Sequence, residues 1–131
     1  MSTPLQLACL CAAWCRTCDA YAATLRGVVE DLAAEGMRLH VTWIDIEDEA
    51  DLVGDFDVET FPTLVVIDGA DVRFAGAVTP EPATLSRLLR ALAADAAAGV
   101  PARAVPAEAA AFAHRLGQRT ARAGVGRVVG G

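Results

Sequence analysis

Four cysteines lie close together near the N-terminus, at positions 9, 11, 15 and 18. Cys15 and Cys18 form a C-x-x-C pair within the segment Trp14-Cys15-Arg16-Thr17-Cys18. Two thiols at this spacing can cycle between a dithiol and a disulfide, and the same spacing also occurs in zinc sites. The residue types therefore indicate either thiol–disulfide exchange or metal binding.

The elements around this pair favour redox chemistry. An apolar run over residues 5–13 predicts a buried strand, and apolar residues at helical spacing then predict a helix over about 16–35, ending at Gly36. Cys15 falls at the helix N-terminus, where unsatisfied N–H groups, the helix dipole and Arg16 favour a thiolate. Cys18 lies one turn further on, more shielded and placed to attack a mixed disulfide on Cys15.

The other two cysteines belong to the predicted strand. Side chains alternate along a strand, so Cys9 and Cys11 share one face. Residues two apart in a strand lie near the upper limit of a disulfide's reach, which argues against a bond between them. We interpret both as small buried hydrophobic residues.

Downstream, the pattern predicts a strand, a short helix in an acidic segment, a buried strand with its hairpin partner, and a closing helix. These elements cover about residues 37–46, 49–55, 64–67, 72–75 and 82–98. We therefore expect a domain over residues 1–98 and a basic C-terminal tail over 99–131, with one helix near 107–118.

The tail and the acidic segment carry opposite charge. Residues 45–59 hold eight acidic residues and no base, whereas the tail holds five arginines and a single acid, Glu108. A solvated loop and a solvated tail are the simpler interpretation. The alternative is that the tail docks on the acidic segment, in the same chain or in a partner, as in a homodimer formed through the tail.

The motifs resemble those of the thioredoxin family over about residues 5–92. W-C-x-x-C is followed about 45 residues later by Thr60-Phe61-Pro62-Thr63, and Gly76 follows the hairpin. The resemblance implies an α/β fold with a central mixed sheet of about four strands flanked by helices. We expect the N-terminal strand–helix unit of full thioredoxins to be absent.

The resemblance also implies roles for individual residues. Cys15 and Cys18 would be catalytic, and Pro62 would be cis and lie beside their sulfurs. The backbone of Phe61 would pair with an extended substrate polypeptide, and Trp14 and Thr60 would complete the substrate surface.

Three features depart from the family pattern. Cys9 stands where the family has a buried aspartate, and Trp43 stands near the position of its lysine, a residue type this chain lacks. The usual proton acceptor for Cys18 is therefore missing. Arg16 and Thr17 replace the family's Gly-Pro, and together with Cys9 they are expected to tune the redox potential.

These observations favour a thiol–disulfide oxidoreductase without a cofactor or a metal, acting on protein disulfides with a redox partner protein. The net charge of −6 argues against nucleic acid as a partner. No apolar run is long enough to span a membrane, and no basic leader precedes residue 5, so we expect a cytoplasmic protein. Two alternatives remain: a thioredoxin-like adaptor with idle cysteines, and, less favoured, a metal-binding module built on the four cysteines.

Overall fold

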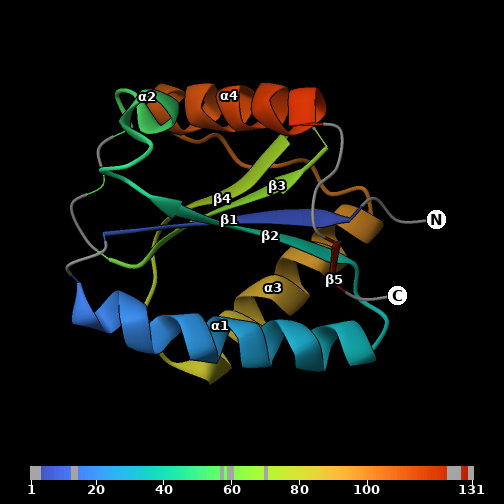
Figure 1. Cartoon of the computed structure of the whole chain (residues 1–131). Coiled ribbons are helices and arrows are strands. Elements are labelled where there is room, and N and C mark those ends of the chain that lie inside the picture. Colours follow the sequence, from blue (N-terminus) through green and yellow to red (C-terminus); the bar gives the residue numbers. More distant parts are fainter. Residues whose placement is uncertain are drawn as a thin grey trace.

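A mixed five-stranded sheet lies between two layers of helices (Figure 1). The computed structural model describes residues 4–12, 15–56, 58, 61–69, 71–123 and 128–129. In chain order the elements are β1 (Leu5–Cys11), α1 (Arg16–Ala34), β2 (Leu39–Asp45), α2 (Ala50–Val53), β3 (Thr63–Asp68), β4 (Asp71–Ala77), α3 (Pro82–Ala97), α4 (Ala107–Ala123) and β5 (Val128–Val129).

The strand order is β4-β3-β1-β2-β5, with β1 at the centre. β1 pairs parallel with β2 and antiparallel with β3, and β4 pairs antiparallel with β3. The four strands β1 to β4 are those predicted from the sequence, so the expected thioredoxin-like mixed sheet is confirmed. None of the helices in the described ranges is long and apolar enough to cross a membrane.

The two faces of the sheet carry separate hydrophobic clusters. Helices α1 and α3 cover one face, and α2 and α4 cover the other (Figure 1). Along β1, Cys9 and Cys11 contribute to the α1/α3 face, whereas Ala8 and Leu10 contribute to the α4 face. The alternation of a strand that is covered on both sides thus places Cys9 and Cys11 together, as predicted.

Helix α1 ends where the sequence predicted. Gly36 has a φ of 98°, a left-handed conformation that a residue without a Cβ adopts without steric cost. The N–H of Gly36 donates to the Ala33 carbonyl at 2.9 Å, and the N–H of Met37 donates to the Leu32 carbonyl at 3.1 Å. These two bonds form a Schellman motif, which stops the helix and turns the chain toward β2.

The C-terminal region is more ordered than the sequence indicated. The predicted tail helix is present as α4, with Phe112 and Leu116 fully buried against the sheet. Beyond the predicted helix, Val128 and Val129 form a short strand, β5, which the sequence analysis did not predict and which pairs antiparallel with β2 at the edge of the sheet. A sheet edge pairs through backbone groups, so a short strand can form there without a strong side-chain pattern.

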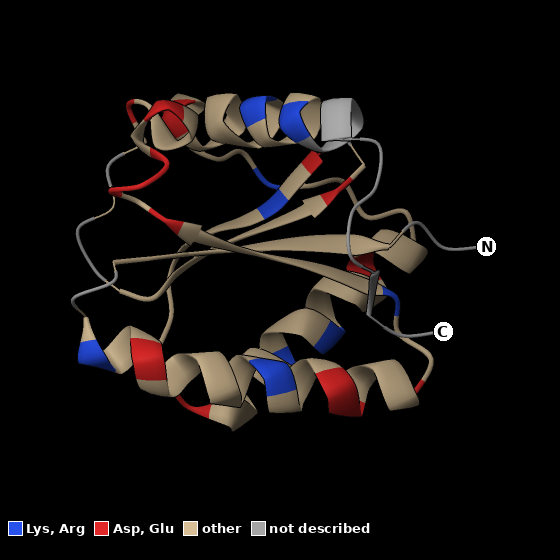
Figure 2. Cartoon of the chain, viewed as in Figure 1, with Lys and Arg blue, Asp and Glu red and all other residues tan. Residues whose placement is uncertain are grey.

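The tail docks on the acidic segment of its own chain. Arg115 donates from Nε to the Leu52 carbonyl at 2.8 Å and from a terminal nitrogen to the Val53 carbonyl at 2.9 Å. Arg119 forms an ion pair with Glu49. Figure 2 shows these elements together, with acidic residues around α2 beside the basic bands of α4. The interpretation of the tail as solvated is therefore wrong for α4, and the docking alternative is confirmed within one chain.

Candidate active site

The cysteines meet where β1 gives way to α1. β1 is buried along almost its whole length and ends at Cys11, and the turn that follows is closed by a hydrogen bond from the Cys15 N–H to the Ala12 carbonyl at 3.0 Å. Cys15 is the N-cap of α1, with extended backbone angles and no side-chain capping bond. The predicted placement of Cys15 at the helix N-terminus is confirmed.

The three cysteines at this junction differ in exposure and bonding. Cys15 is half-buried and free. Cys18, three residues into α1, and Cys11 are each only 1% exposed, and they are joined by a disulfide with a Cα–Cα distance of 5.9 Å. The structure thus bonds Cys18 to Cys11, whereas the C-x-x-C spacing predicted a pair with Cys15.

This bond corrects the interpretation of Cys11 as only a small hydrophobic residue. Cys11 shares its face of β1 with the side chains that contact α1, and Cys18 belongs to the buried face of α1. The signal was present in the sequence, since Cys18 precedes Tyr21 by three residues and Tyr21 begins the apolar stripe of the helix. A cysteine at the start of that stripe faces the end of the preceding strand.

Cys9 lies deeper in the same cluster. It is free and fully buried, and burial raises its pKa from the ordinary 9.0 to about 12. Burial also raises the pKa of Tyr21, and the charge of ionised Cys9 raises it further. Cys9 therefore stays a thiol at neutral pH and is a poor nucleophile.

The predicted proline motif lies beside the cysteine junction. The Phe61–Pro62 peptide bond is cis, the isomer that the resemblance implies. Thr63, the first residue of β3, is the register partner of Leu10, so Pro62 lies at the end of the sheet where β1 ends. Phe61 packs against the same cluster as Cys15. The motif and the cysteines are thus brought together.

The remaining predicted site residues fall into two groups. Arg16 and Thr17 are exposed on the first turn of α1, next to Cys15. Trp14 and Thr60 lie outside the described residues.

The departure from the family's acid–base pair is visible in the sheet register. Cys9 on β1 lies opposite Trp43 on β2, so the two positions that carry the buried aspartate and the lysine in the family are neighbours here as well. With Cys9 held as a thiol and Trp43 uncharged, neither residue accepts a proton near pH 7. The two positions that supply the family's proton acceptor therefore supply none in this chain.

No group of three or more His, Cys, Asp or Glu side chains in the described part of the chain is arranged to hold a metal ion. The four cysteines are divided by position instead, with Cys9 buried alone, Cys11 bonded to Cys18, and Cys15 free. This arrangement does not support a four-cysteine metal site.

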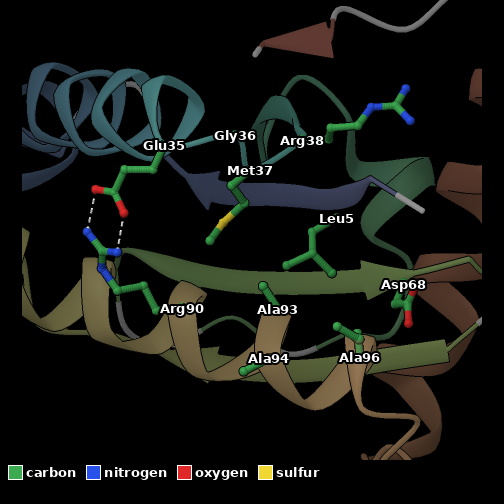
Figure 3. Close-up of a pocket in the computed structure, with 11 residues that line it drawn as sticks. Leu5, Glu35, Gly36, Met37, Arg38, Asp68, Arg90, Ala93, Ala94 and Ala96 are labelled. Atoms are coloured by element: carbon green, nitrogen blue, oxygen red, sulfur yellow. Dashed lines mark hydrogen bonds and ion pairs between the residues drawn. The ribbon is translucent and has the colours of Figure 1, made fainter. Parts of the chain in front are cut away.

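A cavity of about 820 Å³ lies at the other end of the sheet (Figure 3). It is lined by Leu5, the first residue of β1, and by Glu35, which Arg90 of α3 approaches with two guanidinium nitrogens. Leu5 and Cys11 are separated by the length of β1, roughly 20 Å at the usual rise of a strand. The cavity is therefore separate from the cysteine site.

Comparison with known proteins agrees with this geometry. The family model described as thioredoxin matches residues 2–91, well over half of the sequence. The chain belongs to the thioredoxin family. None of the curated proteins compared with the sequence matches it.

Solved structures of thioredoxins share the fold. The germline-specific thioredoxin Deadhead of Drosophila melanogaster is 19% identical with a TM-score of 0.58, over 69% of this chain and 82% of its own. Chloroplastic thioredoxin z is 24% identical with a TM-score of 0.56, over 70% and 80% of the two chains. Mitochondrial thioredoxin 3 of Saccharomyces cerevisiae is 16% identical with a TM-score of 0.56, over 68% and 79%. These similarities establish the fold of the matched region.

Proposed function

We propose that this protein is a thiol–disulfide oxidoreductase that exchanges electrons with protein disulfides through Cys15 and Cys18. One observation carries the proposal. Within a thioredoxin fold, Cys15, whose thiol is half-buried and free, is the N-cap residue of α1 and lies three residues before Cys18, a cysteine whose sulfur is already in a disulfide. An accessible nucleophile and a disulfide-forming neighbour are the two parts that this reaction needs.

In the proposed reaction, the Cys15 thiolate attacks one sulfur of a substrate disulfide. A mixed disulfide forms, and the other substrate sulfur leaves as a thiolate. The Cys18 thiolate then attacks the Cys15 sulfur, which releases the second substrate thiolate and leaves a Cys15–Cys18 disulfide. The substrate gains two electrons and the protein loses two, so a partner protein with a dithiol must restore them.

Exposure supports the division of roles between the two cysteines. Cys18 is 1% exposed, so an external disulfide can approach Cys15 but not Cys18. Cys18 can then act only within the molecule, as a resolving cysteine does. Cys15 is also the N-cap residue of α1, and the unsatisfied N–H groups of a helix N-terminus favour nearby negative charge.

The substrate is proposed to bind beside the cis proline. In the proposal, the backbone of Phe61 pairs with an extended segment of the substrate, and Trp14 and Thr60 extend this surface. Support comes from the position of Phe61 and Pro62 at the cysteine end of the sheet. We further propose that Arg16 and Thr17, both exposed next to Cys15, set the potential together with Cys9.

We also propose a reducing, cytoplasmic location, because the accessible free thiol of Cys15 persists most readily there. The dithiol partner protein would act in the same compartment.

The test compares two single substitutions in the reduction of a protein disulfide, such as that of insulin, with dithiothreitol as the electron source. Cys15→Ser should reduce the rate to the uncatalysed background, because the accessible nucleophile is lost. Cys18→Ser should retain the first step and accumulate a covalent complex that reductant releases. The exposed substitution Arg26→Gln on α1 is the control and should leave the rate unchanged. Full activity in the Cys15→Ser protein would contradict the proposal.

A second candidate is a binding or adaptor protein whose cysteines take no part in thiol–disulfide exchange. The observation that favours it is the pairing of Cys9 with Trp43 where the family has its proton-transfer pair. An adaptor would bind its partner equally well after both Cys15 and Cys18 are replaced by serine. An oxidoreductase would lose the covalent complex with the same substitutions.

A further inference from the structure

The bond between Cys11 and Cys18 is not part of the proposed two-cysteine reaction. It joins the last residue of β1 to the first turn of α1, so Cys15 lies in the sequence between the two bonded cysteines. Cys15 is held in that turn by its N–H bond to the Ala12 carbonyl at 3.0 Å. Cys18 thus has two cysteine neighbours in the sequence and the fold: Cys15, three residues before it, and Cys11, across the turn.

These two neighbours differ in their access to other molecules. Cys11 is 1% exposed, like Cys18, so a disulfide between them is closed to large external thiols. Cys15 is half-buried and keeps contact with solvent. A disulfide that moved from Cys15–Cys18 to Cys11–Cys18 would therefore move from a reachable to a protected position.

Cys9 does not compete for this role. It shares the face of β1 with Cys11 but lies two residues earlier in the strand, and it is free and fully buried. Its raised pKa also keeps it protonated at neutral pH. Cys11 is the cysteine of the strand that the structure places in bonding distance of Cys18.

We propose that Cys11 is a third redox cysteine, which takes over Cys18 from the Cys15–Cys18 disulfide and stores the oxidised state inside the protein. This inference rests on the proposed function and adds a step to it. The Cys11 thiol loses its proton and attacks the Cys18 sulfur, the Cys11–Cys18 bond forms, and the Cys15–Cys18 bond breaks. Cys15 leaves as a thiolate and takes up a proton in place of the one that Cys11 released, so no electrons and no net protons enter or leave the protein.

The step has a functional consequence. The oxidised protein regains a free nucleophile at Cys15, although it already carries one disulfide. Cys15 can then form a mixed disulfide with a second substrate, or it can attack Cys18 and return the stored disulfide to the surface for reduction. Cys15 is in this scheme the single connection between the buried disulfide and other proteins.

The experiment maps the disulfide in the full-length chain. Fully reduced protein is oxidised with one equivalent of diamide, which removes two electrons, and free thiols are alkylated with N-ethylmaleimide first under native and then under denaturing conditions. Cleavage with trypsin after Arg16 and with chymotrypsin after Trp14 places Cys11, Cys15 and Cys18 on three different peptides. Mass spectrometry then identifies the linked pair and the alkylated thiols.

The expected result for the unmodified protein is a Cys11–Cys18 link with Cys15 alkylated under native conditions. Cys11→Ser should give a Cys15–Cys18 link and lose the native alkylation of Cys15. The control Cys9→Ala should give the same map as the unmodified protein. A Cys15–Cys18 link with Cys11 alkylated in the unmodified protein would overturn the proposal.

The map of the unmodified protein requires no substitution, so poor folding of a variant cannot conceal the answer. It also requires no substrate, so it is independent of the proposed catalytic activity. A Cys15→Ser protein that still reduces insulin would overturn the proposed function, whereas the wrong linkage would overturn only the role of Cys11.

Discussion

The two faces of the sheet are built in different ways. On the face covered by α1 and α3, the cysteines come from β1 and the start of α1, two elements that follow one another directly in the chain. On the opposite face, α4 covers β3 and β4 and contacts α2. The hydrogen bonds from Arg115 of α4 to the carbonyls of Leu52 and Val53 join residues that are 63 and 62 positions apart in the sequence. One face carries the reactive groups, and the other is closed by the C-terminal segment.

The two faces of the sheet therefore differ in what holds them together. The cysteine face depends on local geometry, namely a buried strand, a short turn and a helix N-terminus. The α4 face depends on a distant segment that supplies Phe112 and Leu116 to the hydrophobic cluster. Changes to the α4 face should therefore affect stability, and changes at the cysteines should affect chemistry, provided that the two faces act independently.

The largest expected effect comes from removing the tail. A chain ending at residue 98 leaves Leu10, Ile44 and Val65 without the cover of α4, and we predict that it loses cooperative unfolding or aggregates. A chain ending at residue 123 keeps α4 and should still unfold cooperatively in a urea titration followed by circular dichroism. A chain of residues 1–98 as stable as the full protein would show that the tail is separate from the domain.

A single substitution in α4 should have the next largest effect. Phe112 is fully buried, and its ring lies 5.8 Å from that of Phe56. Phe112→Ala should lower the free energy of unfolding by about 3–5 kcal/mol, because it leaves a cavity under the helix. The exposed substitution Gln118→Ala on the same helix is the matched control and should change it by less than about 0.5 kcal/mol. Equal effects would contradict the packing described for α4.

The two arginines that hold α4 to α2 should differ in importance. Arg115→Ala removes hydrogen bonds to two carbonyls and should cost about 1–3 kcal/mol. Arg119→Ala breaks a more exposed ion pair and should cost no more than about 1 kcal/mol, less at high salt. Urea titrations of both proteins at low and high salt would measure the difference. A larger loss of unfolding free energy for Arg119→Ala than for Arg115→Ala would show that the ion pair, rather than the hydrogen bonds to backbone carbonyls, holds α4 against α2.

The predicted effect that is smallest at neutral pH lies on the cysteine face, because it develops only as the pH rises above about 9. The pKa of Cys9 is raised to about 12 in the folded protein, so an unfolded chain releases this proton at lower pH than the folded one. This contribution to stability is complete below the unfolded pKa, near 9, and is lost as the pH rises toward 12. We compare the reduced unmodified protein with reduced Cys9→Ala between pH 9 and 11. The free energy of unfolding of the unmodified protein should fall more steeply, by roughly 1 kcal/mol for each pH unit. If the free energies of unfolding of the two proteins changed in parallel with pH, the raised pKa of Cys9 would be contradicted.

The parts of the fold that the sequence predicted are those set by neighbouring residues. The alternation of β1, the apolar stripe of α1, the stop at Gly36 and the position of Cys15 each depend on a window of fewer than twenty residues. The cis peptide before Pro62 is different, because local sequence favours the trans isomer and only the family resemblance indicated cis.

The parts that were missed depend on distant pairing. The bond between Cys11 and Cys18 requires the facing sides of a strand and a helix to be known together, which spacing alone does not provide. The docking of Arg115 and the pairing of β5 with β2 join segments that are far apart in the chain. A homodimer formed through the tail stays a prediction, and α4 already uses its apolar face within its own chain.

The central claim, that Cys15 and Cys18 form a working dithiol, is tested most directly by equilibrating the protein with glutathione buffers and counting free thiols. The fully reduced chain has four thiols. Two of them should disappear together in one two-electron transition, at a potential between roughly −270 and −120 mV. Cys18→Ser should abolish this transition, and Cys11→Ser, which leaves Cys15 as the partner of Cys18, should retain it. Four free thiols across the whole range of buffers would contradict the claim.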